Sequence, residues 1–162
     1  MPYPANVVNI MIASPSDVAK ERQLITMIIH DWNSIHAEDR RTVLMPIAWE
    51  THSTPEMGDR GQAIINRQVL DKCDLLVAVF WTRLGSPTRD SASGTVEEIR
   101  KHLAAHRPAM IYFSGAPVDP ESIDPEQYKA LKAFRKECEN NGLIAKYDSM
   151  EDCANQFSRH LA

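Results

Sequence analysis

The sequence predicts an α/β fold in which an open, five-stranded parallel sheet lies between two layers of helices. Short apolar runs rich in Val and Ile alternate five times with longer segments of helical periodicity. The run DLLVAVFW at residues 74–81 is nearly continuous, which is typical of a central parallel strand covered on both faces. The length of 162 residues fits one core, so we expect a single domain over residues 1–162. The chain stops inside a helical pattern, which is compatible with a longer parent protein.

Each element has a local justification. The apolar, β-branched runs predict strands at residues 7–14, 43–50, 74–81, 108–114 and 143–149. The helical periodicity predicts helices at residues 14–35, 61–73, 95–107, 126–142 and 150–162. Pro46 suits an edge position for the second strand, and Asn141-Gly142 is a stop signal for the fourth helix.

The first helix carries the clearest start signal. Ser14 is the expected N-cap, Pro15 suits the first helical position and Asp17 follows three residues after the cap. The apolar stripe of this helix repeats at helical spacing through Val18, Leu24, Ile25, Ile28 and Ile29.

Right-handed crossovers between the strands favour the flavodoxin-like order 2-1-3-4-5. In such sheets ligands bind beyond the carboxyl ends of the strands, where the strand order reverses. Here that point follows the first and third strands, at residues 14–17 and 81–88. The predicted helix that carries Glu97 and Glu98 begins beside the second of these segments.

Glu97 and Glu98 allow two interpretations. If Thr95 is the N-cap, Glu98 is the last residue of a Thr-x-x-Glu capping box and has a structural role. If Glu98 turns into the cleft instead, Ser93 is available as the cap. The two glutamates flank the apolar stripe of the helix, so periodicity does not choose between them.

The 13-residue loop at residues 82–94 predicts a binding function, since loops of this length are often functional. Trp81 could stack on a base, Arg83 could pair with a phosphate and Glu98 could face a sugar. Each side chain also has a structural interpretation: Trp81 as half-buried packing, Arg83 as a solvated charge and Glu98 as a helix cap. Further candidates for substrate binding lie on the same rim: Ser14, Ser16, Asp17, Trp49, Glu50, Gly85, Thr88, Gly94 and Thr95.

Composition excludes several function classes. The net charge is −4 and no Lys/Arg block stands out, so we expect no nucleic-acid partner. The apolar runs are too short to cross a bilayer, and the N-terminus lacks the features of a signal peptide. The three cysteines, at positions 73, 138 and 153, are widely spaced, which favours reduced thiols in the cytoplasm. No metal site is predicted, and His102 and His106 are expected to be partly exposed helix residues.

The segments "CDLLVAVF…SGTVEEI…A…RPAMIYFS" resemble the nucleoside 2-deoxyribosyltransferases, whose nucleophilic glutamate falls on Glu98. The same segment resembles the Trp-Cys-x-x-Glu-Leu motif of TIR domains without its Trp-Cys pair, and the catalytic glutamate again falls on Glu98. Nearly the whole chain, with "IASPSDVAKER", "INRQVLDKCDLLVAVFWTRLGSPT" and "SIDPEQYKALKAF", resembles a TIR-like bacterial family of unknown function.

These resemblances imply cleavage of the bond between a ribose and a base. The first hypothesis is an NAD(P) glycohydrolase that uses Glu98, takes NAD as substrate without a cofactor, self-associates and serves as an effector in bacterial defence or stress signalling. The second is a deoxyribosyltransferase-like N-glycosidase, for which Asp90 is the candidate acidic partner. The third is a TIR-like protein-interaction module without chemistry.

Overall fold

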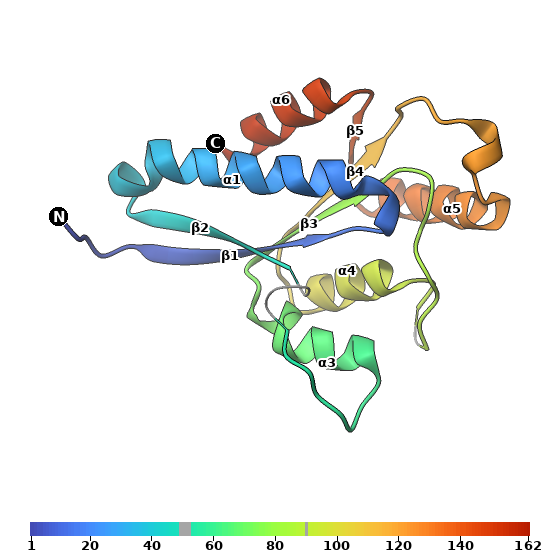
Figure 1. The fold of residues 1–162 in the computed structure, drawn as a ribbon, viewed down its shortest axis with the longest axis horizontal. Helices are drawn as coiled ribbons and strands as arrows, with labels where there is room; N and C mark the ends of the chain where they lie inside the picture. Colours follow the sequence, from blue (N-terminus) through green and yellow to red (C-terminus); the bar gives the residue numbers. More distant parts are fainter. Residues whose placement is uncertain (49–52, 90) are drawn as a thin grey trace.

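The computed structural model describes residues 1–48, 53–89 and 91–162, in which a single parallel sheet runs through the middle of the molecule (Figure 1). Its strands are β1 (Asn6–Ala13), β2 (Thr42–Ile47), β3 (Leu75–Phe80), β4 (Ala109–Ser114) and β5 (Ala145–Tyr147). They pair in the order β2-β1-β3-β4-β5, which confirms the predicted topology. Pro46 lies on β2 at the edge of the sheet, as expected.

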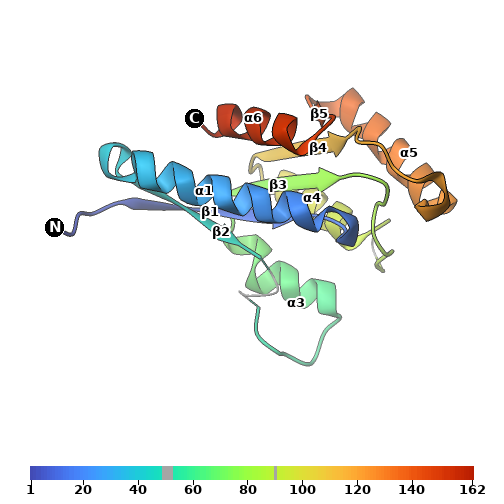
Figure 2. The ribbon, with the colours of Figure 1, turned by 45° about the horizontal axis from the view of Figure 1, so that its top comes forward.

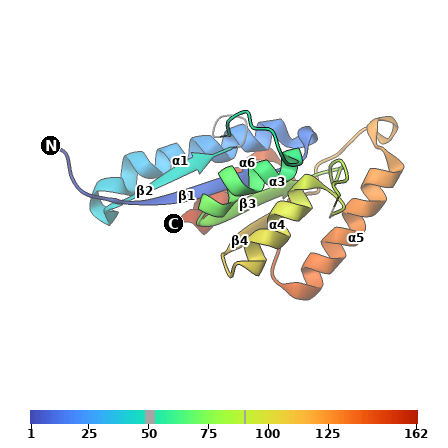
Figure 3. The same cartoon turned by 90° about the horizontal axis from the view of Figure 1, so that it is seen from below.

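Helices cover both faces of the sheet, as Figures 2 and 3 show from two sides. The α-helices are α1 (Ala19–Arg40), α3 (Gly61–Gln68), α4 (Gly94–Ala104), α5 (Pro125–Asn141) and α6 (Met150–Leu161). Short 3-10 turns are η1 (Ser16–Val18), η2 (Leu70–Lys72) and η3 (Pro120–Ser122). The helix α1 runs five residues beyond its predicted end and stops where Arg41 takes a left-handed conformation with φ 51°.

The strand β3 is buried on both faces, which confirms its predicted central place. Val77 and Val79 point toward α1 and α6 and join the core formed with Ile25, Ile29 and Phe157. The alternate side chains of the same strand, among them Leu76, Ala78 and Phe80, pack against α4 and α5 on the other face. Because successive side chains of a strand point to opposite faces, this one apolar run supplies both cores.

The predicted cap of the first helix is wrong. Pro15 is extended (φ −64°, ψ 173°), and η1 separates it from α1, so the Ser14 side chain caps neither segment. Asp17 accepts hydrogen bonds from the backbone N–H of Thr82 at 3.0 Å and from its hydroxyl at 2.7 Å. The carboxylate therefore ties the start of the first helical segment to the end of β3, and does not bond to its own first turn. The expected apolar stripe of α1 is confirmed, with Val18, Ile25 and Ile29 fully buried.

Within the part of the chain that the structure describes, no helix is both long and apolar enough to cross a membrane.

Candidate functional site

The structure at the start of α4 distinguishes between the two interpretations of Glu97 and Glu98. Ser93 is completely buried, and its hydroxyl accepts a hydrogen bond from the backbone N–H of Val96 at 3.1 Å. Ser93 is therefore the N-cap, and the expectation of a Thr95–Glu98 capping box is wrong. The extended backbone of Ser93 (φ −160°, ψ 166°) places its hydroxyl over the first turn, so the cap lies two residues before the Thr95 that the capping box requires. The alternative in which Ser93 supplies the cap is confirmed.

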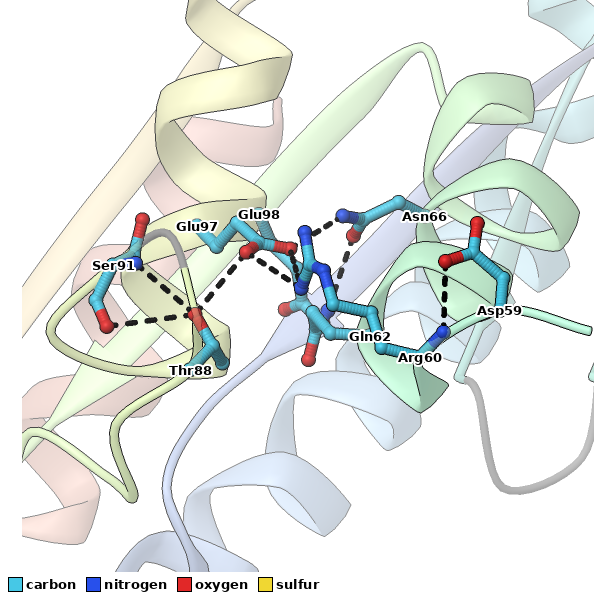
Figure 4. A network of polar contacts seen from close by, with 8 residues as sticks. All are labelled: Asp59, Arg60, Gln62, Asn66, Thr88, Ser91, Glu97 and Glu98. Atoms are coloured by element: carbon cyan, nitrogen blue, oxygen red, sulfur yellow. Dashed lines mark hydrogen bonds and ion pairs between the residues drawn. The ribbon is translucent and has the colours of Figure 1, made fainter.

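Glu97 is the structural member of the pair. The residue is 2% exposed, and its carboxylate accepts hydrogen bonds from three side chains (Figure 4). Arg60 donates at 3.0 Å to Oε1, Asn66 donates at 2.7 Å to Oε2, and the Thr88 hydroxyl donates at 3.1 Å to Oε1. Burial on its own would raise the pKa of Glu97, but these hydrogen bonds and the charge of Arg60 outweigh it and lower the pKa. Glu97 thus joins α4 to α3 and to the loop that precedes α4.

Glu98 points in a different direction. Its Oε1 accepts a hydrogen bond from the Gln62 side-chain amide at 3.1 Å, and the residue is 6% exposed. The same amide of Gln62 donates to Asn66 at 3.0 Å, so the two glutamates are linked through one pair of α3 side chains (Figure 4). Gly94 permits this arrangement, because a Cβ there would lie 2.6 Å from the Gln62 side-chain oxygen.

Glu98 lines a cleft of about 450 Å³ at the carboxyl end of β1. We name it the Glu98 cleft, and its walls come from the end of β1, the start of α3, the loop before α4 and the first turn of α4. It brings together most of the residues that the sequence singled out: Ser14, Ser16, Arg83, Gly85, Thr88, Gly94, Thr95 and Glu98. The predicted location at the switch point of the sheet is therefore where a cleft exists.

Two arginines contribute positive charge to the Glu98 cleft. Arg22 of α1 and Arg83 both line it, and Arg83 donates to the Ser16 hydroxyl at 3.1 Å. Among the described residues, the buried Nε of Arg83 and the buried hydroxyl of Ser14 have no hydrogen-bond partner. Buried donors of this kind are usually satisfied, so they are suited to an anionic or hydroxylated ligand.

The expected convergence of Trp81, Arg83 and Glu98 is only partly present. Trp81 does not line the Glu98 cleft; its indole packs against the α1 and α6 core and donates to the backbone oxygen of Ala116 at 3.0 Å. Strand alternation explains this, since Trp81 follows Val79 by two positions and points to the same face of the sheet. Asp17 lies with Trp81 in a neighbouring cleft. The predicted candidates Trp49, Glu50 and Asp90 lie outside the described residues.

The loop before α4 is held in a defined conformation. Gly85 has φ +107°, a value that favours glycine, and its backbone N–H donates to the Gln127 side chain of α5 at 3.1 Å. Thr88 closes a turn with Ser91, whose backbone N–H donates to the Thr88 hydroxyl at 3.2 Å. Gly85 and Thr88 therefore shape one wall of the Glu98 cleft with their backbone and with short side chains.

Sequence reasoning missed Gln62, Asn66, Arg60 and Arg22. Gln62 and Asn66 are four residues apart and lie on one face of α3, which is a polar signal that the sequence contains. Their partners on α4 are more than thirty positions away, so only the folded topology reveals the pairing.

Metal or thiol chemistry has little support in the described residues. His102 is buried and not partly exposed as predicted; its Nε2 lies 2.8 Å from the Pro108 backbone oxygen, and burial lowers its pKa. His106 follows the end of α4 in a left-handed conformation with φ 59°. No group of three potential metal ligands occurs among the described residues. Burial raises the pKa of Cys73 and of Cys153 to about 12, which keeps both thiols protonated.

Comparison with known proteins identifies one family. Residues 9–162 match the model of a family described as "Domain of unknown function (DUF4062)". No curated protein matches the chain.

Similar solved structures include two flavodoxins and a dehydrogenase. The flavodoxin of Streptococcus pneumonia is 15% identical, with 96% of this chain and 97% of that chain covered and a TM-score of 0.43. Flavodoxin 1 from Bacillus cereus is 14% identical, with 98% and 100% covered and a TM-score of 0.41. Homoserine dehydrogenase of S. aureus is 12% identical, with a TM-score of 0.42. The match covers 88% of this chain but only 33% of the dehydrogenase chain, so this chain spans about a third of that protein's length.

Proposed function

This chain belongs to the family described as domain of unknown function DUF4062, and we propose that it hydrolyses the bond between nicotinamide and ribose in NAD(P), with Glu98 as the catalytic carboxylate. One observation carries the proposal. Ser93 provides the cap of α4 and Glu97 provides the ties to its neighbours, while Glu98 lines a cleft that also contains two arginines. Glu98 is therefore the member of the acidic pair whose position in a cleft suits a catalytic role.

The position of Glu98 suits stabilisation of positive charge on a sugar. In the proposed reaction the bond between ribose C1′ and the nicotinamide nitrogen breaks, and its electron pair leaves with neutral nicotinamide. C1′ becomes oxocarbenium-like, which an adjacent carboxylate stabilises or traps. Water then supplies its oxygen to C1′ and loses one proton, so the products are nicotinamide, ADP-ribose (or its phosphorylated form) and H⁺.

The Gln62 side chain orients the Glu98 carboxylate for this step. The carboxylate accepts a hydrogen bond from Gln62, which stabilises an ionised acceptor.

The arginines favour a nucleotide over an uncharged nucleoside. Arg22 and Arg83 line the same cleft as Glu98, and the Arg83 guanidinium is oriented by its bond to Ser16. Guanidinium groups pair with phosphate through charge-assisted hydrogen bonds. A ribose at Glu98 with its 5′-phosphate at these arginines would use both features of the cleft.

The test is release of nicotinamide from NAD by concentrated protein, measured by chromatography for wild type, Glu98→Gln and Glu98→Asp. We expect release by wild type and a loss on the order of 10²–10³-fold in Glu98→Gln. Lys101→Gln, an exposed substitution on the same helix, is the matched control and should keep the wild-type rate. Equal rates in wild type and Glu98→Gln would remove Glu98 from the reaction.

A second candidate follows from the Gly94-Thr95 and Glu98 pattern, which resembles the nucleoside 2-deoxyribosyltransferases. That function would use the same cleft and the same carboxylate, but would release a base from a nucleoside and leave NAD intact. A panel of deoxynucleosides, assayed with the same variants, distinguishes the two: base release that depends on Glu98, without nicotinamide release, would favour the transferase-like function.

A further inference from the structure

A second cleft of about 400 Å³ lies beside the Glu98 cleft at the carboxyl edge of the sheet. We name it the Trp81 cleft. It lies on the α1 side, where the start of α1 meets the segments that follow β3, β4 and β5, and the residues that matter here are Asp17, Lys20, Glu21, Trp81 and Tyr147.

The two clefts share one residue. Ser16 lines both, and its hydroxyl accepts the hydrogen bond from Arg83, which itself lines the Glu98 cleft. The border between the clefts is therefore a hydroxyl with a guanidinium beside it. A phosphate group is the ligand that this pair suits best.

The Trp81 cleft offers a fixed aromatic wall. The indole of Trp81 is half-buried, and its N–H is occupied by the Ala116 backbone oxygen at 3.0 Å, so the ring cannot turn without losing that bond. Ala19, Pro117 and Met150 complete a lining that is largely apolar. A fixed indole in an apolar recess is suited to a flat, weakly polar group such as a nucleobase.

Two carboxylates also line the Trp81 cleft. Glu21 is 8% exposed, and in the described part of the chain its Oε2 accepts a hydrogen bond from the Tyr147 hydroxyl at 2.8 Å. Asp17 uses Oδ2 for Thr82, whereas its buried Oδ1 has no hydrogen-bond partner among the described residues. Carboxylate oxygens with remaining capacity are suitable acceptors for the hydroxyls of a ribose.

We propose that the Trp81 cleft is a second subsite that binds the nucleoside remote from the scissile bond, so that the substrate is a dinucleotide lying across both clefts. This inference rests on the proposed function. The ribose to be cleaved lies at Glu98, the diphosphate lies at Arg83 and Ser16, and the second base lies against Trp81. The substrate class is then a dinucleotide and not a mononucleotide or nucleoside.

The experiment blocks the Trp81 cleft without removing a contact of the core. Ala19→Trp places a bulky side chain at the exposed first residue of α1, which lines the Trp81 cleft but not the Glu98 cleft. Ser34→Trp, at an exposed position of the same helix outside both clefts, is the matched control. Nicotinamide release is measured from NAD and from nicotinamide mononucleotide, which lacks the second nucleoside, and binding of AMP is measured by calorimetry.

We expect Ala19→Trp to raise KM for NAD at least tenfold, to leave cleavage of nicotinamide mononucleotide within twofold of wild type, and to weaken AMP binding at least tenfold. Ser34→Trp should match wild type in all three. Equal effects of Ala19→Trp on both substrates, or unchanged AMP binding, would overturn the subsite. If wild type releases no nicotinamide from either substrate, the proposed function fails, and AMP binding alone decides whether the Trp81 cleft is a nucleoside subsite.

Discussion

Replacing Glu97 by Gln tests whether the first glutamate of the pair is structural. Gln has the shape of Glu but has only one acceptor oxygen and carries an NH₂ group in place of the other. Oriented toward Arg60 and Thr88, its oxygen keeps those two bonds and its NH₂ meets the donating amide of Asn66. Asn66 cannot turn its own amide to compensate without losing the bond that its oxygen accepts from Gln62.

The magnitude follows from these contacts. At least one buried donor loses its acceptor, which costs about 1–3 kcal/mol, and the remaining bonds lose their charge assistance. Arg60 keeps access to water, since its side chain is 25% exposed, so its loss is moderate. We therefore expect Glu97→Gln to lower the free energy of unfolding by about 2–4 kcal/mol, less than the upper values seen when a fully buried pair is broken. For a domain of this size that corresponds to a fall in Tm of about 4–16 °C.

Urea denaturation at neutral pH, followed by tryptophan fluorescence, measures the change, with thermal unfolding as the second readout. Glu98→Gln is the matched control on the adjacent residue. Its amide oxygen can still accept the hydrogen bond from Gln62, so we expect it to lower the free energy of unfolding by less than Glu97→Gln does. The reasoning is refuted if Glu97→Gln unfolds within 0.5 kcal/mol of wild type, a threshold of about the size of an ordinary surface effect, or if Glu98→Gln is the more destabilised of the two.

Three further predictions concern the same helix. Ser93→Ala should lower the free energy of unfolding by about 0.5–2 kcal/mol through loss of the cap, whereas Thr95→Ala should cost less; the opposite ranking in urea would restore the capping-box interpretation. The pKa of Glu97 is lowered in the folded state, so the ionised carboxylate stabilises the fold fully at pH values above its ordinary pKa of 4.5, and this contribution is lost as the pH falls. Wild type should therefore lose stability below about pH 5 more steeply than Glu97→Gln. Parallel pH profiles of the two proteins would contradict this. Gly94→Ala should displace Gln62 and reduce nicotinamide release on the order of 10²-fold while changing the unfolding midpoint little, and full activity would show that the Gln62–Glu98 bond is dispensable.

The fold could be predicted because its signals are local and repeated. The apolar run of β3 and the alternation of strands and helices fix the sheet, and short right-handed crossovers leave few orders for the strands. The switch-point rule then locates the cleft from the strand order alone, and the cleft lined by Ser14, Arg83 and Glu98 lies there.

The roles of individual side chains were harder to predict, because they depend on partners distant in sequence. Ser14 and Thr95 both have a hydroxyl that can cap a helix, but neither is an N-cap. The extended backbone of Pro15 separates Ser14 from the first helix, and the hydroxyl of Ser93 caps α4 in place of Thr95. The face to which Trp81 points follows from strand alternation, and counting two positions from Val79 would have assigned it to the α1 side. The network around Glu97 joins residues up to 37 positions apart, so no local pattern could reveal it.

The central claim is that Glu97 has a structural role and Glu98 a catalytic one. It is tested most directly by measuring the free energy of unfolding and the rate of nicotinamide release from NAD for both Gln variants. The account predicts a crossed result. Glu98→Gln should be the more stable of the two variants and lose activity on the order of 10²–10³-fold, whereas Glu97→Gln should be the less stable variant and keep most of its activity at temperatures where it is folded. Nicotinamide release that is unaffected by Glu98→Gln, or lost equally in both variants while both remain folded, would contradict the account.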